Sequence, residues 1–384
     1  MIYYKGRQID EINAYNVEGT TLNNQSKEIE INKNGETIIT YDEGYTGLEQ
    51  VTVNVNVASQ GGEGGNSFSV IGYPSVPQYI QDGIEYAKTI QNNWDASITN
   101  RNNAFKDDKQ LVYFPLVDTS NVTDMGYMFN QSKIQYVPAI DTSKVTKMNG
   151  MFSGCTNLIS LDLSSFDTSK VTRMNGIFQY CSGLTSIEFG DNFSTSKITN
   201  MSNMFSSCYN LTSLDLSSYD TSKVTSMDRM FYYCSGLTTL NLSNWNTSNV
   251  TNKIYMFYNC HKLQRIDGYL DWSKISSYPS SFIYSSSSYG CPLRYMTIKN
   301  LGTTGDTFNF NKTYLQNWGD ESDTTTYPLS VGARQSLVDS LLTYSYDRAA
   351  NGLSNATIQL NSRVKARLTA DEITAIQNKG YTIS

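Results

Sequence analysis

Apolar residues recur along the middle of the chain with a period of about 26 positions. The motif Asp-Thr-Ser-Lys-Val-Thr, or a variant of it, opens each unit, and a phenylalanine follows its β-branched residue seven positions later. The β-branched residues, at intervals of 23, 26, 27, 26, 26 and 25, are Val122, Val145, Val171, Ile198, Val224, Val250 and Ile275. The phenylalanines are Phe129, Phe152, Phe178, Phe205, Phe231, Phe257 and Phe282. Two columns in one register predict seven stacked units of supersecondary structure.

Each unit combines two periodicities. Apolar side chains at positions 0, 3, 6, 7 and 10 have the spacing of one face of a short helix; in the third unit they are Val171, Met174, Ile177, Phe178 and Cys181. A Leu-x-x-Leu-x-Leu stretch, such as Leu158, Leu161 and Leu163, alternates as a strand does. One strand and one short helix per unit predict an α+β fold class, a right-handed leucine-rich-repeat solenoid over residues 111–301.

The units resemble a known family. LDLSSFDTSKVTRMNGIFQYCSGLTSIEF and LDLSSYDTSKVTSMDRMFYYCSGLTTLNL are similar to the BspA-like leucine-rich repeats of bacterial surface proteins, which also occur in proteins of gut bacteriophages. This resemblance covers about half of the chain and implies adhesion and ligand binding rather than a shared active site. The last units depart from the pattern, because Lys253 replaces the first methionine and a Ser/Tyr-rich insertion occupies residues 278–289.

The N-terminal region has a different pattern. Residues 27–57 alternate with period two, and we expect a hairpin turn at Asn34 and Gly35, so residues 1–57 are predicted to form a small β-rich domain. Residues 58–66 are glycine-rich and predict a flexible linker. The β-rich segment resembles short modules near the start of phage tail and fibre proteins, which implies an attachment role.

An open solenoid needs caps at both ends of its core. Residues 67–110 are predicted to form a helical N-terminal cap, because helical spacing relates Ile80, Ile84, Ala87, Ile90 and Trp94. Residues 302–384 are predicted to form an α/β C-terminal cap, with a helix over residues 330–348 and a capping box at Thr369 and Glu372. The closing β-α-β segment resembles the C-terminal ends of phage proteins that carry this repeat.

Composition argues against catalysis and nucleic-acid binding. Only 17% of residues are charged and the net charge is -6, so the basic surface that nucleic acid or anionic lipid requires is missing. The single histidine, His261, nearly excludes His-based triads and multi-histidine metal sites. Neither a signal-peptide pattern nor an apolar run of membrane-spanning length is found. We therefore expect no enzyme activity, catalytic residue, cofactor, metal site, or nucleic-acid or membrane partner.

Two repeated columns have structural interpretations. An aspartate precedes Thr-Ser in most units and is expected to cap free backbone N–H groups; these residues are Asp118, Asp141, Asp167, Asp220 and Asp271. A cysteine column is expected to be a reduced, buried ladder, although stacked units also bring neighbouring thiols within disulfide range. Its members are Cys155, Cys181, Cys208, Cys234 and Cys260.

Two further columns are candidate ligand-binding surfaces. Alternation places Asp162, Glu188, Asp215, Asn241 and Asp267 on the outward face of the strands, where the acids hold a cation or polar ligand or simply form a hydrated surface. Near the helical edge, variable tyrosines offer a stacking platform or cover neighbouring units. These are Tyr127, Tyr180, Tyr209, Tyr232, Tyr233, Tyr255 and Tyr258.

Together these patterns predict a non-enzymatic adhesion or receptor-binding subunit of a bacteriophage virion, either a tail fibre or a capsid fibre. The solenoid would recognise a bacterial surface glycan or protein, and residues 1–57 would bind other virion proteins. Homo-oligomerisation is expected by analogy with fibres. The alternatives are a bacterial cell-surface adhesin, a purely structural virion component, and a hydrolase with an acidic site on the strand face.

Overall fold

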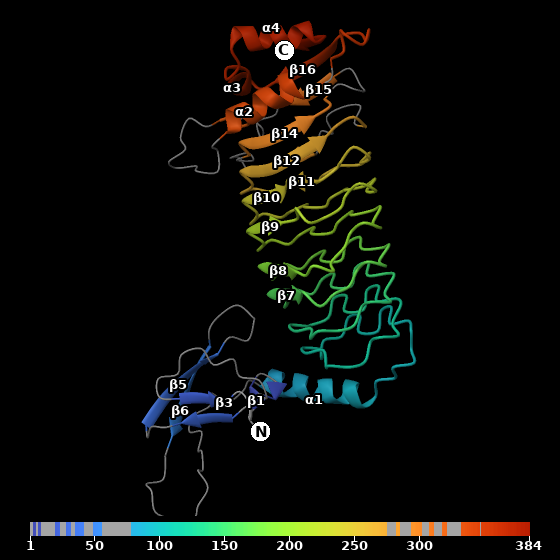
Figure 1. Cartoon of the computed structure of the whole chain (residues 1–384), viewed down its shortest axis with the longest axis vertical. Coiled ribbons are helices and arrows are strands. Elements are labelled where there is room, and N and C mark those ends of the chain that lie inside the picture. Colours follow the sequence, from blue (N-terminus) through green and yellow to red (C-terminus); the bar gives the residue numbers. More distant parts are fainter. Residues whose placement is uncertain are drawn as a thin grey trace, which may run out of the picture. The chain divides into compact units, whose positions relative to one another are not determined.

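The structure is a computed structural model. It describes residues 3–4, 7–8, 20–23, 28–31, 35–41, 49–55, 78–274, 282–284, 293–301, 307–310, 317–320, 332–345 and 347–384. The chain divides into two compact units, Met1–Asn92 and Asn93–Ser384 (Figure 1). The predicted linker at residues 58–66 and most of the insertion at 278–289 lie outside the described residues. Among the helices that are described, none has the length and apolar character needed to span a membrane.

Among its described residues, the first unit holds three antiparallel strand pairs and one helix. Its elements are β1 (Tyr3–Tyr4), β2 (Arg7–Gln8), β3 (Thr20–Asn23), β4 (Glu28–Ile31), β5 (Gly35–Tyr41), β6 (Glu49–Val55) and α1 (Gln78–Asn92). The hairpin predicted at Asn34 and Gly35 is wrong, because β4 pairs with β3 whereas β5 pairs with β6. Gly35 itself lies in β5, opposite Val55. Strands β5 and β6 are each seven residues long, whereas β4 has four. Pairing with β6 therefore gives β5 more ladder hydrogen bonds than pairing with β4 would.

Helical spacing in residues 67–110 is confirmed only as far as Asn92, where α1 ends. Trp94 lies beyond the helix, in the second unit, and its indole N–H donates to the carbonyl of Asp118 at 2.7 Å. Because α1 belongs to the first unit, its role as a cap stays a prediction.

The repeat pattern begins earlier than predicted. Ile98 and Phe105 each lie 24 positions before their counterparts Val122 and Phe129, and the N–H of Phe105 donates to the carbonyl of Met128 at 2.8 Å. The ring of Phe105 stacks on that of Phe129 with centroids 6.0 Å apart. Residues 98–107 therefore form an additional, incomplete unit, and we call residues 93–301 the repeat region.

Eight strands are described in the repeat region, of which six lie in the predicted alternating stretches and two, at residues 257–258 and 283–284, lie where a helix was predicted. They are β7 (Ser160–Leu163), β8 (Ser186–Phe189), β9 (Ser213–Asp215), β10 (Thr239–Leu242), β11 (Phe257–Tyr258), β12 (Arg265–Asp271), β13 (Ile283–Tyr284) and β14 (Tyr295–Lys299). Their pairs are all parallel: β7 with β8, and a second sheet in the order β14-β12-β10-β9, with β11 pairing β13 separately. Figure 1 shows β7, β8, β9, β10, β12 and β14 following one another along the repeat region, whereas the units before β7 have isolated bridges, such as that between Tyr113 and Tyr136.

The short helix predicted in each unit is wrong, since residues 93–274, which are described throughout, contain no helix. A turn segment takes its place, in which the fifth and ninth residues after the β-branched position have φ between 52° and 75°. A right-handed helix excludes such left-handed residues. Alternate N–H groups instead donate to the next unit, as Phe129 does to the carbonyl of Met151 at 2.9 Å. The N–H groups between them close turns within the unit, as Asn130 does to Tyr127.

The core is built from the predicted columns. Six successive phenylalanine pairs from Phe105 to Phe257 stack with centroids 5.4 to 6.1 Å apart and ring planes within 23°. The five described cysteines of the column are free and buried, as the reduced-ladder interpretation predicted. Each thiol bonds to the carbonyl of a phenylalanine one unit earlier, as Cys181 does to Phe152 at 3.0 Å. Burial raises the pKa of Cys155 and of Cys234 to about 12, so the thiols stay protonated.

Stacking is interrupted between the units that begin at Val171 and Ile198. Strands β8 and β9 do not pair, and the parallel bridge that links Lys147 to Arg173 has no counterpart between Arg173 and Asn200. The earlier of the two units is 27 residues long, one more than its neighbours on either side. The extra residue falls in the turn after β8, and it separates the strands while the turn segments remain bonded.

A bulkier side chain accompanies this break. Phe189 occupies a column where Leu163, Leu216 and Leu242 are fully buried, yet it is only half-buried. Its ring lies 4.8 Å from Phe193 and 5.4 Å from Tyr219, centroid to centroid. An aromatic cluster therefore fills the position at which the other units pack a leucine.

The C-terminal elements cover β14. They are β15 (Thr307–Phe310), α2 (Ala333–Val338), the π-helix η3 (Asp339–Thr343), β16 (Ala356–Leu360), α3 (Ser362–Lys365), α4 (Ala370–Asn378) and β17 (Tyr381–Ile383). Strands β15, β16 and β17 form a parallel sheet, so the predicted β-α-β segment is present. The capping box of Thr369 and Glu372 is confirmed. Helix α2 and η3 pack on β14, where the Ser340 hydroxyl accepts the N–H of Ile298 at 2.9 Å.

Candidate functional site

Four of the seven candidate tyrosines gather into one cluster. We call Tyr232, Tyr233, Tyr255 and Tyr258 the tyrosine cluster; they come from the turn segments of two neighbouring units. The Tyr232 ring stacks on Tyr258 with centroids 5.1 Å apart and lies 4.6 Å from Tyr233, while Tyr255 meets Tyr258 edge-on at 5.3 Å. All four are half-buried, so each ring keeps part of its surface in solvent.

The backbone holds two of these tyrosines in an unfavourable conformation. Tyr233 has φ 60° and Tyr255 has φ 56°, in the left-handed region. The same positions of other units hold Gly150, Gly154 and Asn203, which tolerate this region more easily, but they also hold Tyr127 and Tyr180. Sequence analysis treated these positions as unconstrained, which is wrong, since the turn geometry favours glycine or asparagine. A tyrosine there bears a backbone cost, and only Tyr233 and Tyr255 combine that cost with membership of a tyrosine cluster.

An ion pair borders the tyrosine cluster. The guanidinium of Arg229 lies 5.0 Å from the Tyr255 ring centroid and forms a 2.6 Å ion pair with Asp228. Burial, reinforced by the neighbouring phenols, raises the pKa of Tyr232, so its hydroxyl stays protonated at neutral pH. The site therefore offers aromatic faces, phenol donors, one cation and one carboxylate, which suits stacking and hydrogen bonding.

The other three tyrosines lie apart from the tyrosine cluster. The Tyr127 ring covers Gly150 of the next unit so closely that an added Cβ would lie 2.3 Å from it, so this ring packs on a neighbouring repeat. Tyr180 and Tyr209 are 54% and 42% exposed, and neither has a ring contact among the described residues. These two are isolated surface side chains.

The acidic strand column is aligned within each sheet, with Asp162 opposite Glu188 in one, and with Asp215 and Asp267 on either side of Asn241 in the other. The predicted column is interrupted between Glu188 and Asp215, because β8 and β9 do not pair. Some carboxylate oxygens of this column already have protein partners. Asp162 accepts the N–H of Ser164 at 2.8 Å, and Asp267 forms an ion pair with the Arg265 guanidinium at 2.7 Å. Asp215 accepts the N–H of Ser217, and this bond lowers its pKa. No group of three or more metal-ligating side chains occurs in the part of the chain that the structure describes.

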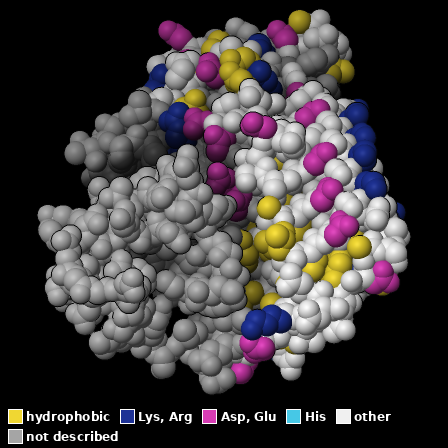
Figure 2. Space-filling model, turned by 60° about the horizontal axis from the view of Figure 1, so that its bottom comes forward, with side chains coloured by type: hydrophobic (Ala, Val, Ile, Leu, Met, Phe, Trp, Pro, Cys, Tyr) yellow, Lys and Arg dark blue, Asp and Glu magenta, His cyan; other side chains and the backbone are white. Residues whose placement is uncertain are grey.

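The aspartates before Thr-Ser cap backbone N–H groups as predicted, although they open turns rather than helices. Asp118 accepts the N–H of Ser120 at 2.9 Å, and Asp167 accepts that of Ser169 at 2.9 Å. The bond from the serine lowers the pKa of each carboxyl. Acidic and basic side chains occupy separate lines along one face of the repeat region (Figure 2), which is typical of a solvated surface.

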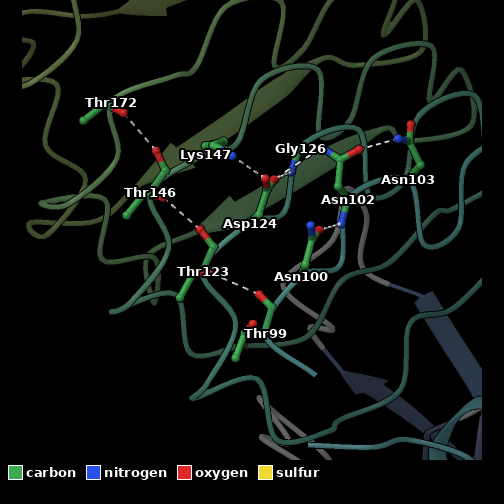
Figure 3. A network of polar contacts seen from close by, with 10 residues as sticks. All are labelled: Thr99, Asn100, Asn102, Asn103, Thr123, Asp124, Gly126, Thr146, Lys147 and Thr172. Carbon is green, nitrogen blue, oxygen red and sulfur yellow. Dashed lines mark hydrogen bonds and ion pairs between the residues drawn. The ribbon is translucent and has the colours of Figure 1, made fainter. Parts of the chain in front are cut away.

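One buried carboxylate escaped the sequence analysis. Asp124 accepts the N–H of Gly126 at 2.9 Å, the Asn102 amide at 3.3 Å and the Lys147 ammonium at 2.8 Å (Figure 3). Burial acts to raise its pKa, but these donors outweigh it and the pKa is lowered. Beside it, the hydroxyl of Thr123 donates to the carbonyl of Thr99 of the preceding unit. The network connects three successive units, so we interpret it as a structural network that stabilises their stacking.

Comparison with known proteins identifies one family. The family described as "Mycoplasma protein of unknown function, DUF285" matches residues 82–139, 99–188 and 185–289, which together span more than half of the chain. A search of curated proteins found no significant match.

Proposed function

The chain belongs to the DUF285 family, that of the BspA-like repeat surface proteins, and from this premise we propose that it is a non-enzymatic adhesion protein. Its repeat region binds a receptor on a bacterial surface, either a glycan or a protein. The observation that carries this proposal is the tyrosine cluster, in which two of four rings sit on left-handed backbone.

The energetic argument supports binding rather than packing. A left-handed residue other than glycine costs about 1–2 kcal/mol, and fold stability alone favours removing that cost. Tyrosine contributes large, rigid, amphipathic contact area, and tyrosines are over-represented among the residues that dominate binding energy at interfaces. A cluster of half-exposed rings beside Arg229 and Asp228 suits a partner that offers an apolar face together with hydrogen-bonding groups.

For the fold we propose that the repeats form a right-handed leucine-rich-repeat solenoid with one strand and one turn segment per unit. The parallel strands, the phenylalanine stack and the cysteine ladder support this proposal. The helix of the original expectation is replaced by the turn segment.

For location we propose a bacteriophage virion, as a tail or capsid fibre, in which residues 1–57 bind other virion proteins and the chain is homo-oligomeric. The resemblance of both chain ends to phage proteins supports this. Membership in a family of surface proteins favours a second candidate, a bacterial cell-surface adhesin. Mass spectrometry of purified phage particles and of shaved bacterial surfaces separates the two.

Attachment of the labelled chain to a panel of bacterial cells tests the adhesion proposal. Replacing Tyr232, Tyr233 and Tyr258 together by serine should lower attachment at least about tenfold, since each exposed hot-spot aromatic is worth about 2 kcal/mol. The matched control replaces Tyr180 and Tyr209, which lie outside the tyrosine cluster, and should attach like the parent. Periodate treatment of the cells abolishes binding to a glycan, and protease treatment abolishes binding to a protein. Equal attachment by the parent and the cluster variant, both folded, overturns the proposal.

A further inference from the structure

A hollow lies on the strand face, at the C-terminal end of the repeat region. Its volume is about 360 Å³, within the range of small-molecule sites. Strands β10, β12 and β14 form its floor, and Asp339 at the start of η3 forms part of its wall. The lining residues are Asn241, Ser243, Asp267, Gly268, Tyr269, Tyr295, Thr297 and Asp339.

An irregularity in β12 shapes this hollow. Between Arg265 and Tyr269 the register with β14 shifts, so four steps along β12 oppose two steps along β14. Gly268 makes this possible, because its φ is 98° and an added Cβ would lie 2.4 Å from the carbonyl of Leu242. Bulges of this kind redirect side chains and are frequent next to binding sites. Here Gly268 stands where Leu216 and Leu242 are buried in other units.

Two carboxylates in the hollow are held in place by their own neighbours. Asp267 accepts the Arg265 guanidinium through Oδ1, at 2.8 Å from Nε. Asp339 accepts the Gln335 amide at 2.8 Å and the Thr343 hydroxyl at 3.1 Å, both also through Oδ1. In both residues Oδ2 has no protein partner among the described residues. Each carboxylate is thus held in place through Oδ1 and can accept further hydrogen bonds through Oδ2.

Two aromatic rings are fixed in the same way. The Arg265 guanidinium lies 3.9 Å from the centroid of Tyr295, and the Lys299 ammonium lies 3.5 Å from that of Tyr269. The Tyr269 hydroxyl also lies 3.3 Å from the Tyr344 hydroxyl. Rings held on one side by a cation are rigid surfaces that a ligand meets without an ordering cost.

The charges in and around the hollow balance. Arg265 forms an ion pair with Asp267, and Lys299 lies over the Tyr269 ring that lines the hollow, so two cations accompany the two carboxylates Asp267 and Asp339. With this formal balance, neither a free cation nor an anion gains a large net attraction. The groups that remain are hydrogen-bond acceptors, amide and hydroxyl donors, and aromatic faces. From this combination we propose that the hollow is a binding site for a neutral saccharide of one or two sugar units. Asp267 and Asp339 accept sugar hydroxyls, Asn241 donates to ring or hydroxyl oxygens, and Tyr269 or Tyr295 stacks on an apolar sugar face.

This saccharide site is independent of the tyrosine cluster. The tyrosine cluster lies on turn segments, whereas the hollow lies on the strand side of the same two units and of the next one, and on η3. The proposal therefore holds or fails separately from attachment through Tyr232 and its neighbours.

Saturation-transfer NMR and calorimetry on the full chain test it, with glucose, galactose, mannose, N-acetylglucosamine and their β-linked disaccharides as neutral probes. Glucuronate and glucosamine serve as charged probes. We expect saturable binding of at least one neutral probe that exceeds binding of both charged probes. Asp267→Asn combined with Asp339→Asn should weaken it at least about tenfold, because two charged acceptors are neutralised while the shape is kept. Tyr269→Ala should also weaken it.

Asp191→Asn is the matched control, since this exposed carboxylate lies in a turn outside the hollow, and it should bind like the parent. The tyrosine cluster variant should also keep its saccharide affinity. Absence of binding to every neutral probe, preference for a charged probe, or full affinity in the folded Asp267/Asp339 variant overturns the proposal.

Discussion

The ring of Phe178 stacks on that of Phe205 with centroids 5.4 Å apart, across the same unit boundary at which β8 and β9 fail to pair. The Phe178 N–H also reaches the next unit, donating to the carbonyl of Met204 at 3.1 Å. On the strand side this boundary is hollowed by about 510 Å³, lined by residues of β8 and β9. The phenylalanine stack and the turn segments therefore hold together two units whose strands are separated.

The first prediction compares two of the three phenylalanines of this unit, Phe178 and Phe189. Phe178→Ala should lower the free energy of unfolding by about 3–5 kcal/mol, because a fully buried ring is lost and a cavity is left. Phe189→Ala should cost less than half as much, because Phe189 is only half-buried beside the hollow. Urea unfolding of both variants measures the difference. Equal costs would show that the strand side of this boundary is packed as tightly as the core.

The second prediction closes the break. Deleting Asp191 restores a 26-residue unit, and Phe189→Leu restores the leucine column, so β8 and β9 should pair. The amide of Thr212 should then gain the bond that Thr238 makes to the preceding unit at 2.8 Å. Amide hydrogen exchange at Thr212 and Leu214 should slow in the variant, whereas exchange at Thr238 should stay unchanged. Unchanged exchange at Thr212 would mean that the extra residue does not cause the separation.

Sequence periodicity predicted the apolar columns because the same positions are buried in every unit. This burial pattern does not depend on the backbone conformation between the columns. Periodicity mispredicted the helix, since apolar positions 0, 3, 6, 7 and 10 suit both a helix and the turn segment. The alternation of Gly150 and Gly154 with Tyr and Asn at equivalent positions was the available signal for left-handed backbone. Tyr232 and Tyr258 were found by composition, but their contact depends on turn geometry that periodicity does not contain.

Only part of the saccharide hollow could be predicted from the sequence. Asp267 was predicted because strand alternation fixes its face. Asp339 and Tyr344 come from a segment more than 70 residues away, and only the packing of η3 on β14 brings them to Tyr269. Gly268 in a leucine column was the visible irregularity that marked the place.

The third prediction tests the left-handed backbone at Tyr180, which has φ 61° and no ring contact among the described residues. Tyr180→Gly should be more stable than Tyr180→Ala by about 1 kcal/mol, because only alanine keeps the strain. Tyr209, whose φ is not positive, is the matched control. At this position the alanine variant should be at least as stable as the glycine variant. Urea unfolding of the four variants decides the point. A more stable alanine variant at both sites would contradict the turn geometry.

The last prediction concerns Lys253, which occupies the column filled by a methionine in the preceding units, such as Met227. Its side chain is buried, and its ammonium donates to the carbonyls of Val250 at 2.9 Å and Asp271 at 3.0 Å. Burial lowers its pKa from 10.5 to about 8. Below pH 8 the lysine is charged in both the folded and unfolded chains, so the folded protein bears the full desolvation penalty.

Between pH 8 and 10.5 the unfolded chain holds the proton while the folded chain has released it. The unfolded state then binds more protons, so this lysine makes the free energy of unfolding rise with pH until the penalty is gone. Lys253→Met should therefore stabilise the protein at pH 7 by up to about 3.5 kcal/mol, at roughly 1.4 kcal/mol per pKa unit. The advantage should shrink towards pH 10. Buried thiols such as Cys155 destabilise both proteins above pH 9, so the quantity to measure is the difference between parent and variant in urea unfolding. A difference that stays constant or grows from pH 7 to 10 would show that Lys253 is charged in the folded protein throughout.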